Sequence, residues 1–140
     1  MKTRGFVATL FLLAFAFAPS QMWGLLPPPP DFSPTLISPK AGQVLYPGQI
    51  VRVEWKTSVR NTYPPYCEIE AWLSLDGGGT YTLSISQSAD PNITFFYWTV
   101  PNTPTNQAIL DIRFGCEPAY PETFHPQTAS PFVILNAGGQ

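Results

Sequence analysis

The two cysteines of this chain lie in segments whose residues alternate between apolar and polar. A β-strand directs successive side chains to opposite faces, so such alternation indicates strands with one buried face. Each cysteine continues the apolar row of its segment; the rows are Cys67, Ile69, Ala71 and Leu73 in one case and Leu110, Ile112, Phe114 and Cys116 in the other. One cysteine begins its strand and the other ends its strand. If the two strands are antiparallel neighbours, these ends meet and a disulfide can form.

A disulfide between Cys67 and Cys116 would also set the register of the two strands. With the cysteines opposite each other, Glu70 lies opposite Arg113 on the outer surface. This opposite-charge pair supports the pairing, because cross-strand neighbours of opposite charge stabilise a sheet. The same register gives three further pairs, Trp72 with Asp111 outside and Ile69 with Phe114 and Ala71 with Ile112 inside.

Short strands separated by turn signals account for most of the chain, and no useful helical period occurs beyond the N-terminal stretch. This pattern predicts an all-β fold, an Ig-like or fibronectin III-like β-sandwich of about seven strands. In Ig-like terms these are strands A, B, C, C′, E, F and G, with the cysteine-containing strands adjacent as C and F. The segments expected to form strands are 35–38, 44–46, 50–56, 67–75, 80–86, 93–100, 108–116 and 131–135.

The N-terminal residues have the parts of a secretory signal peptide. Lys2 and Arg4 precede an uncharged apolar stretch, and Ala18 and Ser20 suit the small positions before a cleavage at Gln21. An uncleaved membrane anchor is the alternative, although the stretch is shorter than the roughly 20 apolar residues that span a bilayer. The expected organisation is a signal peptide at 1–20, a Pro-rich spacer at 21–34 and one Ig-like β-sandwich domain at 35–136.

The composition is typical of an exported β-domain. Loss of the leader leaves five basic and nine acidic residues, which does not favour nucleic acid or anionic lipid as a partner. Apolar residues make up 44% of the chain, so disorder is not expected. A disulfide requires an oxidising compartment, and we therefore expect a secreted protein of the extracellular space or cell envelope with no stable membrane span after leader cleavage.

Four short motifs, in their order and spacing, resemble a known extracellular domain. I-S-P-x-x-G begins at Ile37, P-G-Q-x-V-x-V-x-W ends at Trp55, W-T-V-P begins at Trp98 and S-P-F-V-I begins at Ser130. Together they resemble the Ig-like extracellular domain of the Ser/Thr-rich, GPI-anchored fungal cell-wall family, whose members include proteins linked to β-1,6-glucan assembly, and similar secreted bacterial domains. The resemblance covers about residues 35–135 and implies a sandwich in a wall-associated setting, with no defined catalytic residues.

The segment from Ser74 to Tyr81 resembles an Asp-box, with the pattern S-x-D-x-G-x-T-aromatic found on hairpin turns of sialidases and other β-proteins. In this turn we expect Asp76 to accept backbone N–H groups, while Gly77 and Gly78 supply positive φ. A single box predicts a structural turn and not a sialidase, whose propeller needs repeated blades. A calcium site at Asp76 is the alternative.

The residues give little support for catalysis or for a cofactor. His125 is the sole histidine, and no nucleophile-elbow serine motif is present. Glu68 and Glu70 have the spacing of a glycosidase pair, but they lie on one flat strand face without a cleft, so a solvated face is the preferred interpretation. We expect no catalytic residues, no cofactor and no metal site. A weak metal site at His125 with Glu117 and Glu122 is the remaining alternative.

Aromatic residues gather in two segments, 57–66 and 117–130, which an Ig-like sandwich would present as loops at one end. Their prolines reduce the entropy lost on binding, and tyrosines suit contact with proteins or sugar rings. The alternative is that these aromatics pack on each other and close the end of the sandwich. The candidate binding residues are Arg60, Tyr63, Tyr66, Tyr120, Phe124 and His125.

These observations together predict a secreted, non-catalytic Ig-like module that binds a protein or a glycan at the cell surface or in the cell wall. One alternative is a structural accessory domain that assembles through a sheet edge by strand addition. A small extracellular hydrolase is the other. Asn92 begins the sequon Asn92-Ile93-Thr94 and is a candidate glycosylation site in a eukaryotic secretory pathway.

Overall fold

The computed structural model describes residues 32–57, 67–86, 90–116 and 120–138, and within these ranges it contains nine strands and no helix. The expected signal peptide at 1–20 and most of the expected spacer lie outside these ranges. The strands are β1 (Pro34–Ser38), β2 (Val44–Leu45), β3 (Ile50–Thr57), β4 (Cys67–Ser74), β5 (Leu83–Ser84), β6 (Phe95–Thr99), β7 (Thr105–Cys116), β8 (Tyr120–Thr123) and β9 (Phe132–Ile134). In the part of the chain that the structure describes, no helix has the length and hydrophobicity needed to cross a membrane.

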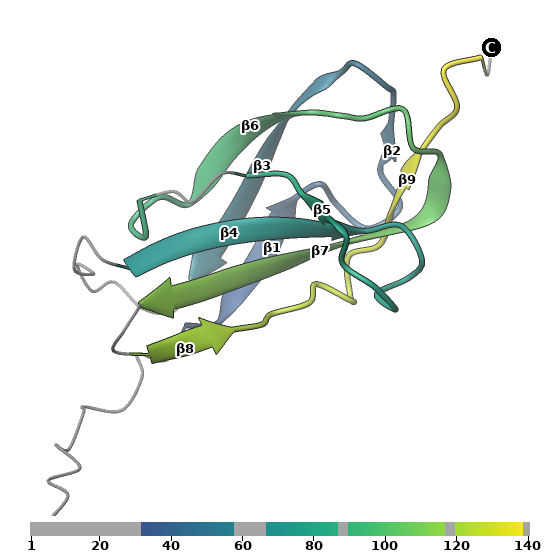
Figure 1. The fold of residues 1–140 in the computed structure, drawn as a ribbon. Helices are drawn as coiled ribbons and strands as arrows, with labels where there is room; N and C mark the ends of the chain where they lie inside the picture. The colour runs from purple at the N-terminus through teal and green to yellow at the C-terminus, as the bar shows by residue number, and fades with distance from the viewer. Residues whose placement is uncertain (1–31, 58–66, 87–89, 117–119, 139–140) are drawn as a thin grey trace, which may run out of the picture.

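The described strands form two sheets, which are the two layers of the fold (Figure 1). The first sheet has three strands in the order β1-β3-β6. The second has six strands, in the order β2-β9-β7-β4-β5, with β8 also paired to β7. The pairing of β2 with β9 is parallel, with Val44 opposite Val133 and Leu45 opposite Ile134, and the other pairings between the described strands are antiparallel.

A single hydrophobic core lies between the two sheets. Val53 and Trp55 from β3 pack in one cluster with Ile69 from β4, Leu110 from β7 and Phe132 from β9, and each of the five is at most 1% exposed. These residues occupy the alternating apolar positions of their strands, so the period-two pattern of the sequence is the direct cause of this core. Burial of each such side chain contributes about 1.5–3 kcal/mol, and the sheets are held together chiefly by this term.

The predicted pairing of the cysteine-containing strands is confirmed. Cys67 is bonded to Cys116, and β4 and β7 are antiparallel neighbours. The ladder runs without a register shift from this pair to Ser74 opposite Ile109. The crosslink therefore joins two strands of the same sheet. The expected outer and inner pairs are all present, namely Glu70 with Arg113, Trp72 with Asp111, Ile69 with Phe114 and Ala71 with Ile112.

Some strand boundaries differ from the expected ones. The return strand of the hairpin was expected at 80–86, but only Leu83–Ser84 pairs with β4 as a strand. Beyond it the Ser86 hydroxyl accepts the N–H of Ala71 at 2.7 Å, so a side chain replaces a ladder bond there. The strand expected from 108 begins at Thr105, because it pairs with β9 across a register shift.

Candidate functional site

The expected loop 117–130 is wrong over much of its length, because it contains β8 and then continues as extended chain along β7. The Ile112 N–H donates to the His125 carbonyl at 3.3 Å, and the Gln127 N–H donates to the Leu110 carbonyl at 2.7 Å. The prolines of this segment favoured a loop, but a strand tolerates proline where the ladder is interrupted. Pro121 lies at such a place, since the β7–β8 register shifts next to it.

The candidate binding residues are consequently not all at one place. Phe124 is 57% exposed, while His125 is partly buried and its ring contacts the buried Phe32 edge-on, with the ring centroids 5.3 Å apart. Consecutive residues of extended chain face opposite sides of the sheet. His125 therefore helps to cover the interior, and Phe124 lies on the outer surface.

The other four candidate binding residues lie wholly or partly outside the part of the chain that the structure describes. Arg60, Tyr63 and Tyr66 lie outside the described residues. Tyr120 begins β8 opposite Cys116, and its side chain is likewise outside the description. Segment 58–66 nevertheless ends immediately before Cys67, and segment 117–119 begins immediately after Cys116. These two cysteines are bonded to each other.

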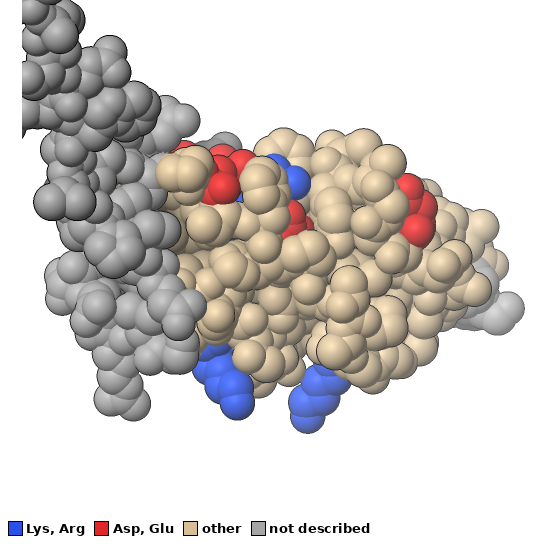
Figure 2. Space-filling view, turned by 90° about the horizontal axis from the view of Figure 1, so that it is seen from below, with Lys and Arg blue, Asp and Glu red and all other residues tan. Residues whose placement is uncertain are grey.

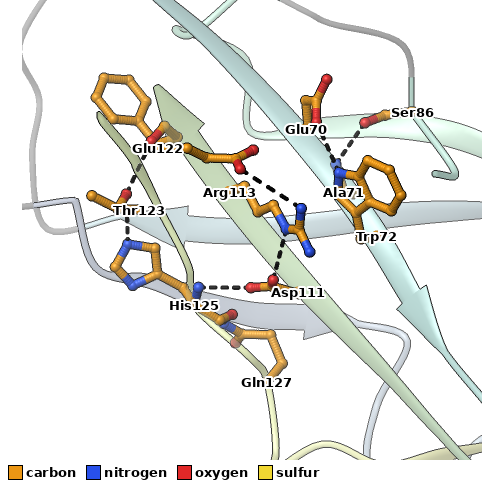
Figure 3. A network of polar contacts seen from close by, with 11 residues as sticks. Glu70, Ala71, Trp72, Ser86, Asp111, Arg113, Glu122, Thr123, His125 and Gln127 are labelled. Carbon is orange, nitrogen blue, oxygen red and sulfur yellow. Dashed lines mark hydrogen bonds and ion pairs between the residues drawn. The ribbon is translucent and has the colours of Figure 1, made fainter. Parts of the chain in front are cut away.

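The outer face around Phe124 is built on Arg113, whose side chain is only 14% exposed. Its Nε atom lies 2.8 Å from Asp111 Oδ2, and its NH1 atom lies 3.7 Å from Glu122 Oε2. Its guanidinium carbon lies 4.6 Å from the ring centroid of Trp72 and 4.8 Å from that of Phe124. We call these five residues of β4, β7 and the β8 segment the Arg113 cluster; Figure 3 shows its polar contacts.

Asp111 is the residue of this cluster whose burial the sequence did not reveal. It lies opposite Trp72 in the outer row of β7, as expected, but it is only 1% exposed. Its Oδ1 atom accepts the backbone N–H of His125 at 2.7 Å, and its Oδ2 atom pairs with Arg113 (Figure 3). Oδ1 thus fastens the segment after β8 to β7, while Oδ2 is neutralised by Arg113 of the same strand, and together these contacts explain the burial of a charged side chain there.

Glu70 also differs from the expectation. It lies opposite Arg113 in the register, but its Oε2 atom accepts the indole N–H of Trp72 at 2.8 Å, and Asp111 and Glu122 are the ion-pair partners of Arg113. The expected ion pair between Glu70 and Arg113 is therefore replaced by a contact of Glu70 along β4 and by contacts of Arg113 along β7 and with β8.

The outer face of the second sheet is acidic. Burial raises the pKa of Glu122, the positive charge of Arg113 opposes this shift, and the carboxylates of Glu70, Asp111 and Glu68 add to it. Among the described residues of this face, Arg113 is the one basic residue beside the four carboxylates of Glu68, Glu70, Asp111 and Glu122. Figure 2 shows acidic side chains gathered along one side of the molecule and basic side chains projecting from the opposite side.

The predicted Asp-box turn has the expected contacts. The Ser74 hydroxyl donates to Asp76 Oδ1 at 2.6 Å, and the backbone N–H of Thr80 donates to the same oxygen at 2.9 Å. The Thr80 hydroxyl donates to Oδ2 at 2.8 Å. Gly77 and Gly78 have φ of 75° and 93°, as the turn requires. These hydrogen bonds, that of Ser74 first, lower the pKa of Asp76 to about 2.

The metal alternatives find no grouped ligands in the described residues. No three His, Cys, Asp or Glu side chains of this part of the chain are close enough together to hold an ion. Glu122 pairs with Arg113 on the outer face, whereas the His125 ring lies 3.1 Å from the Thr123 hydroxyl. Asn92, the candidate glycosylation site, is exposed in the turn before β6, and its side-chain amide donates to Asp90 at 2.9 Å.

A second exposed aromatic surface lies on the opposite sheet and was missed by sequence reasoning. Tyr97 of β6 is 68% exposed and Phe95 is 41% exposed. The guanidinium carbon of Arg52, from β3, lies 4.1 Å from the Phe95 ring centroid. The aromatic run 95–98 was read only as a strand of the sandwich, and the available signal was its alternation, which leaves two aromatic rings on the outer face.

No protein-family model, curated protein or solved structure matches this chain.

Proposed function

We propose that this chain is a secreted, non-catalytic binding module of Ig-like architecture that recognises a protein or a glycan at the cell surface or in the cell wall. The strand order supports the Ig-like part of the proposal. In Ig-like lettering the first sheet is A-B-E, and the second contains G-F-C-C′ with a short strand added beside G. The Cys67–Cys116 disulfide supports export, because such crosslinks persist in oxidising compartments.

The observation that carries the binding role is the exposure of Phe124 on a fixed base. More than half of this aromatic side chain is open to solvent, while Arg113 beneath it is nearly buried and is held by Asp111 and Glu122. An exposed aromatic group that is already fixed loses little entropy when it binds a partner. The other tyrosines predicted to bind are Tyr63 and Tyr66, which precede Cys67 in sequence, and Tyr120, which begins β8 opposite Cys116.

The surroundings of Phe124 suit a partner that is neutral or basic. Three carboxylates, those of Glu68, Glu70 and Glu122, lie on the same outer face, and Arg113 neutralises only part of their charge. Aromatic rings beside carboxylates are suited to sugar rings with many hydroxyl groups and to basic protein surfaces. The non-catalytic part of the proposal is supported by the structural roles of Asp111 and His125, which hold β7 and the β8 segment together.

A binding array tests this proposal. The purified chain is applied to immobilised glycans and cell-surface proteins, and the hits are repeated with Phe124→Ala, Tyr120→Ala and Tyr63→Ala. We expect at least one of these variants to lose binding while its melting temperature stays near that of the unmodified chain. Tyr46→Ala is the matched control, because Tyr46 is 56% exposed, against 57% for Phe124, and lies in the turn between β2 and β3. Undiminished binding by all three variants, or hydrolysis of a substrate that persists through repurification, would overturn the proposal.

A further inference from the structure

We infer that β6 pairs with β6 of a second copy of this chain, so that two three-stranded sheets join into one continuous sheet. This inference goes beyond the proposed binding function, because it concerns the sheet opposite the Arg113 cluster. It rests on three properties of β6: one edge of the strand is unpaired among the described strands, the strand lacks the features that usually block such an edge, and its sequence is complementary to itself in an antiparallel pair.

β6 is an edge strand of the first sheet, and among the described strands it pairs with β3 alone. The Trp55 N–H donates to the Thr94 carbonyl at 3.0 Å, and the Val100 N–H donates to the Gln49 carbonyl at 2.9 Å. Residues 94 and 100 therefore direct their backbone groups toward β3. Because this direction alternates along an antiparallel strand, residues 95, 97 and 99 direct their N–H and C=O groups toward the open edge.

Natural sheets protect such edges with short strands, proline, charge or irregular pairing. The other edges of the described sheets show these features. β2 and β5 have two residues each, and β8 contains Pro121 and Glu122. β1 begins at Pro34, and its register shifts between Leu36 and Ser38.

β6 has none of these features. Its five residues are Phe-Phe-Tyr-Trp-Thr, without charge, proline or glycine, and aromatic residues are strong strand formers. Its pairing with β3 has no register shift from Ile50 opposite Thr99 to Glu54 opposite Phe95. An edge of this kind pairs readily with another strand.

A second copy fits this edge because β6 is complementary to itself. In an antiparallel pair with its two-fold axis at Tyr97, Tyr97 lies opposite Tyr97 of the second copy and Phe95 lies opposite Thr99. All of these residues direct their backbone groups outward, so each pair exchanges two hydrogen bonds. The strand is uncharged, so no like charges meet in this register, and the two tyrosines form a cross-strand aromatic pair. The irregular β1 edge stops further addition, and the assembly closes as a dimer.

Analytical ultracentrifugation over a concentration series tests the inference on the purified chain. We expect a monomer–dimer equilibrium that Tyr97→Glu weakens about tenfold or more, because two carboxylates then face each other across the axis. Within one copy the new carboxylate lies opposite Arg52, so the fold itself should tolerate it. Tyr97→Pro should have a similar effect, since it removes an N–H that points away from β3. Phe124→Ala, on the other sheet, should leave the equilibrium unchanged.

Amide hydrogen exchange gives a readout that needs no variant. The N–H groups of residues 95, 97 and 99 should exchange rapidly in dilute solution and slowly in concentrated solution, while those of residues 94 to 100 that face β3 stay protected throughout. A chain that remains monomeric at high concentration would overturn the inference, even if the edge then takes up a foreign extended peptide. A dimer that is insensitive to both Tyr97 variants would overturn it as well. Neither result would affect the array binding assigned to Phe124.

Discussion

Arg113 stacks against Phe124 on the outer surface of the second sheet, with the guanidinium carbon 4.8 Å from the ring centroid. The contact joins β7 to the chain that follows β8. Arg113 is also ion-paired with Asp111, which is almost completely buried. The same side chain therefore supports the proposed binding surface and neutralises a charge within the fold.

Removal of this guanidinium should destabilise the fold strongly. In Arg113→Met the carboxylate of Asp111 remains buried without its counter-charge, and we expect a loss of about 3 kcal/mol or more in the free energy of unfolding. Urea denaturation measures it. The matched control is Arg52→Met, which removes a similar contact with Phe95 and Glu54 on the other sheet, where the arginine side chain is 45% exposed. There the loss should stay within about 1 kcal/mol, as for surface ion pairs. Equal losses at both sites would contradict the structural role of Arg113.

The disulfide should contribute a large share of the stability. Cys67 and Cys116 are 49 residues apart in sequence, and closing a loop of that size removes roughly 4 kcal/mol of unfolded-state entropy in the chain-entropy model. The double variant Cys67→Ala, Cys116→Ala should lose about 2–5 kcal/mol in urea denaturation. Because the chain contains only these two cysteines, a reducing agent should lower the stability of the unmodified chain similarly and leave the double variant unchanged. If the reducing agent also lowered the stability of the double variant, its effect would not come from reduction of the disulfide.

Asp76 should make the stability depend on acid pH. Its pKa in the folded chain is about 2, below the ordinary value of 3.8, because the turn donates hydrogen bonds to the carboxylate. As the pH falls, the carboxylate of Asp76 therefore binds a proton in the unfolded chain before it does so in the folded chain. The contribution of Asp76 to the free energy of unfolding is present above about pH 4 and is lost as the pH falls toward 2. Urea midpoints measured across this range should fall less steeply for Asp76→Asn than for the unmodified chain. Identical slopes for the two proteins would contradict the assignment.

Substitution of a glycine in the same turn by a residue with a side chain should destabilise the fold. Gly78 has φ of 93°, and a Cβ atom added there would lie 3.1 Å from the Tyr81 hydroxyl oxygen. Gly78→Ala should therefore lower the free energy of unfolding by about 1–2 kcal/mol. Gly138→Ala is the control, because its Cβ atom would meet nothing within 4 Å. Similar melting temperatures for the two variants would show that the turn adapts without cost.

Much of the fold could be predicted from local pattern. The period-two alternation around Cys67 and Cys116 was enough to predict both the neighbouring strands and their register, because a disulfide requires the two residues to be adjacent. The Asp-box turn was also predictable, since the contacts of Asp76 are made within a few residues of sequence. Both successes depend on information contained in short segments.

The missed features depend on contacts between distant segments. The burial of Asp111 follows from the path of the chain after β8, which brings the backbone of His125 against it. The prolines of that segment concealed its strand pairing. The open edge of β6 could not be recognised either, because an alternating aromatic run has the same pattern at the edge and in the middle of a sheet. Only the strand order β1-β3-β6 shows that β6 lies at the edge of its sheet and not in the middle.

The parallel pair β2–β9 is oriented to resist a pull along its strands. A pull toward the N-terminus on β2 and toward the C-terminus on β9 draws the two strands along their lengths in opposite directions. The bonds from the Val133 N–H to the Gln43 carbonyl at 2.9 Å and from the Leu135 N–H to the Leu45 carbonyl at 3.0 Å then resist together in shear and do not unzip one at a time. If they rupture, the covalent loop from Cys67 to Cys116 stays closed and limits the extension. A chain pulled through these two strands would therefore lengthen only in part while the disulfide is intact.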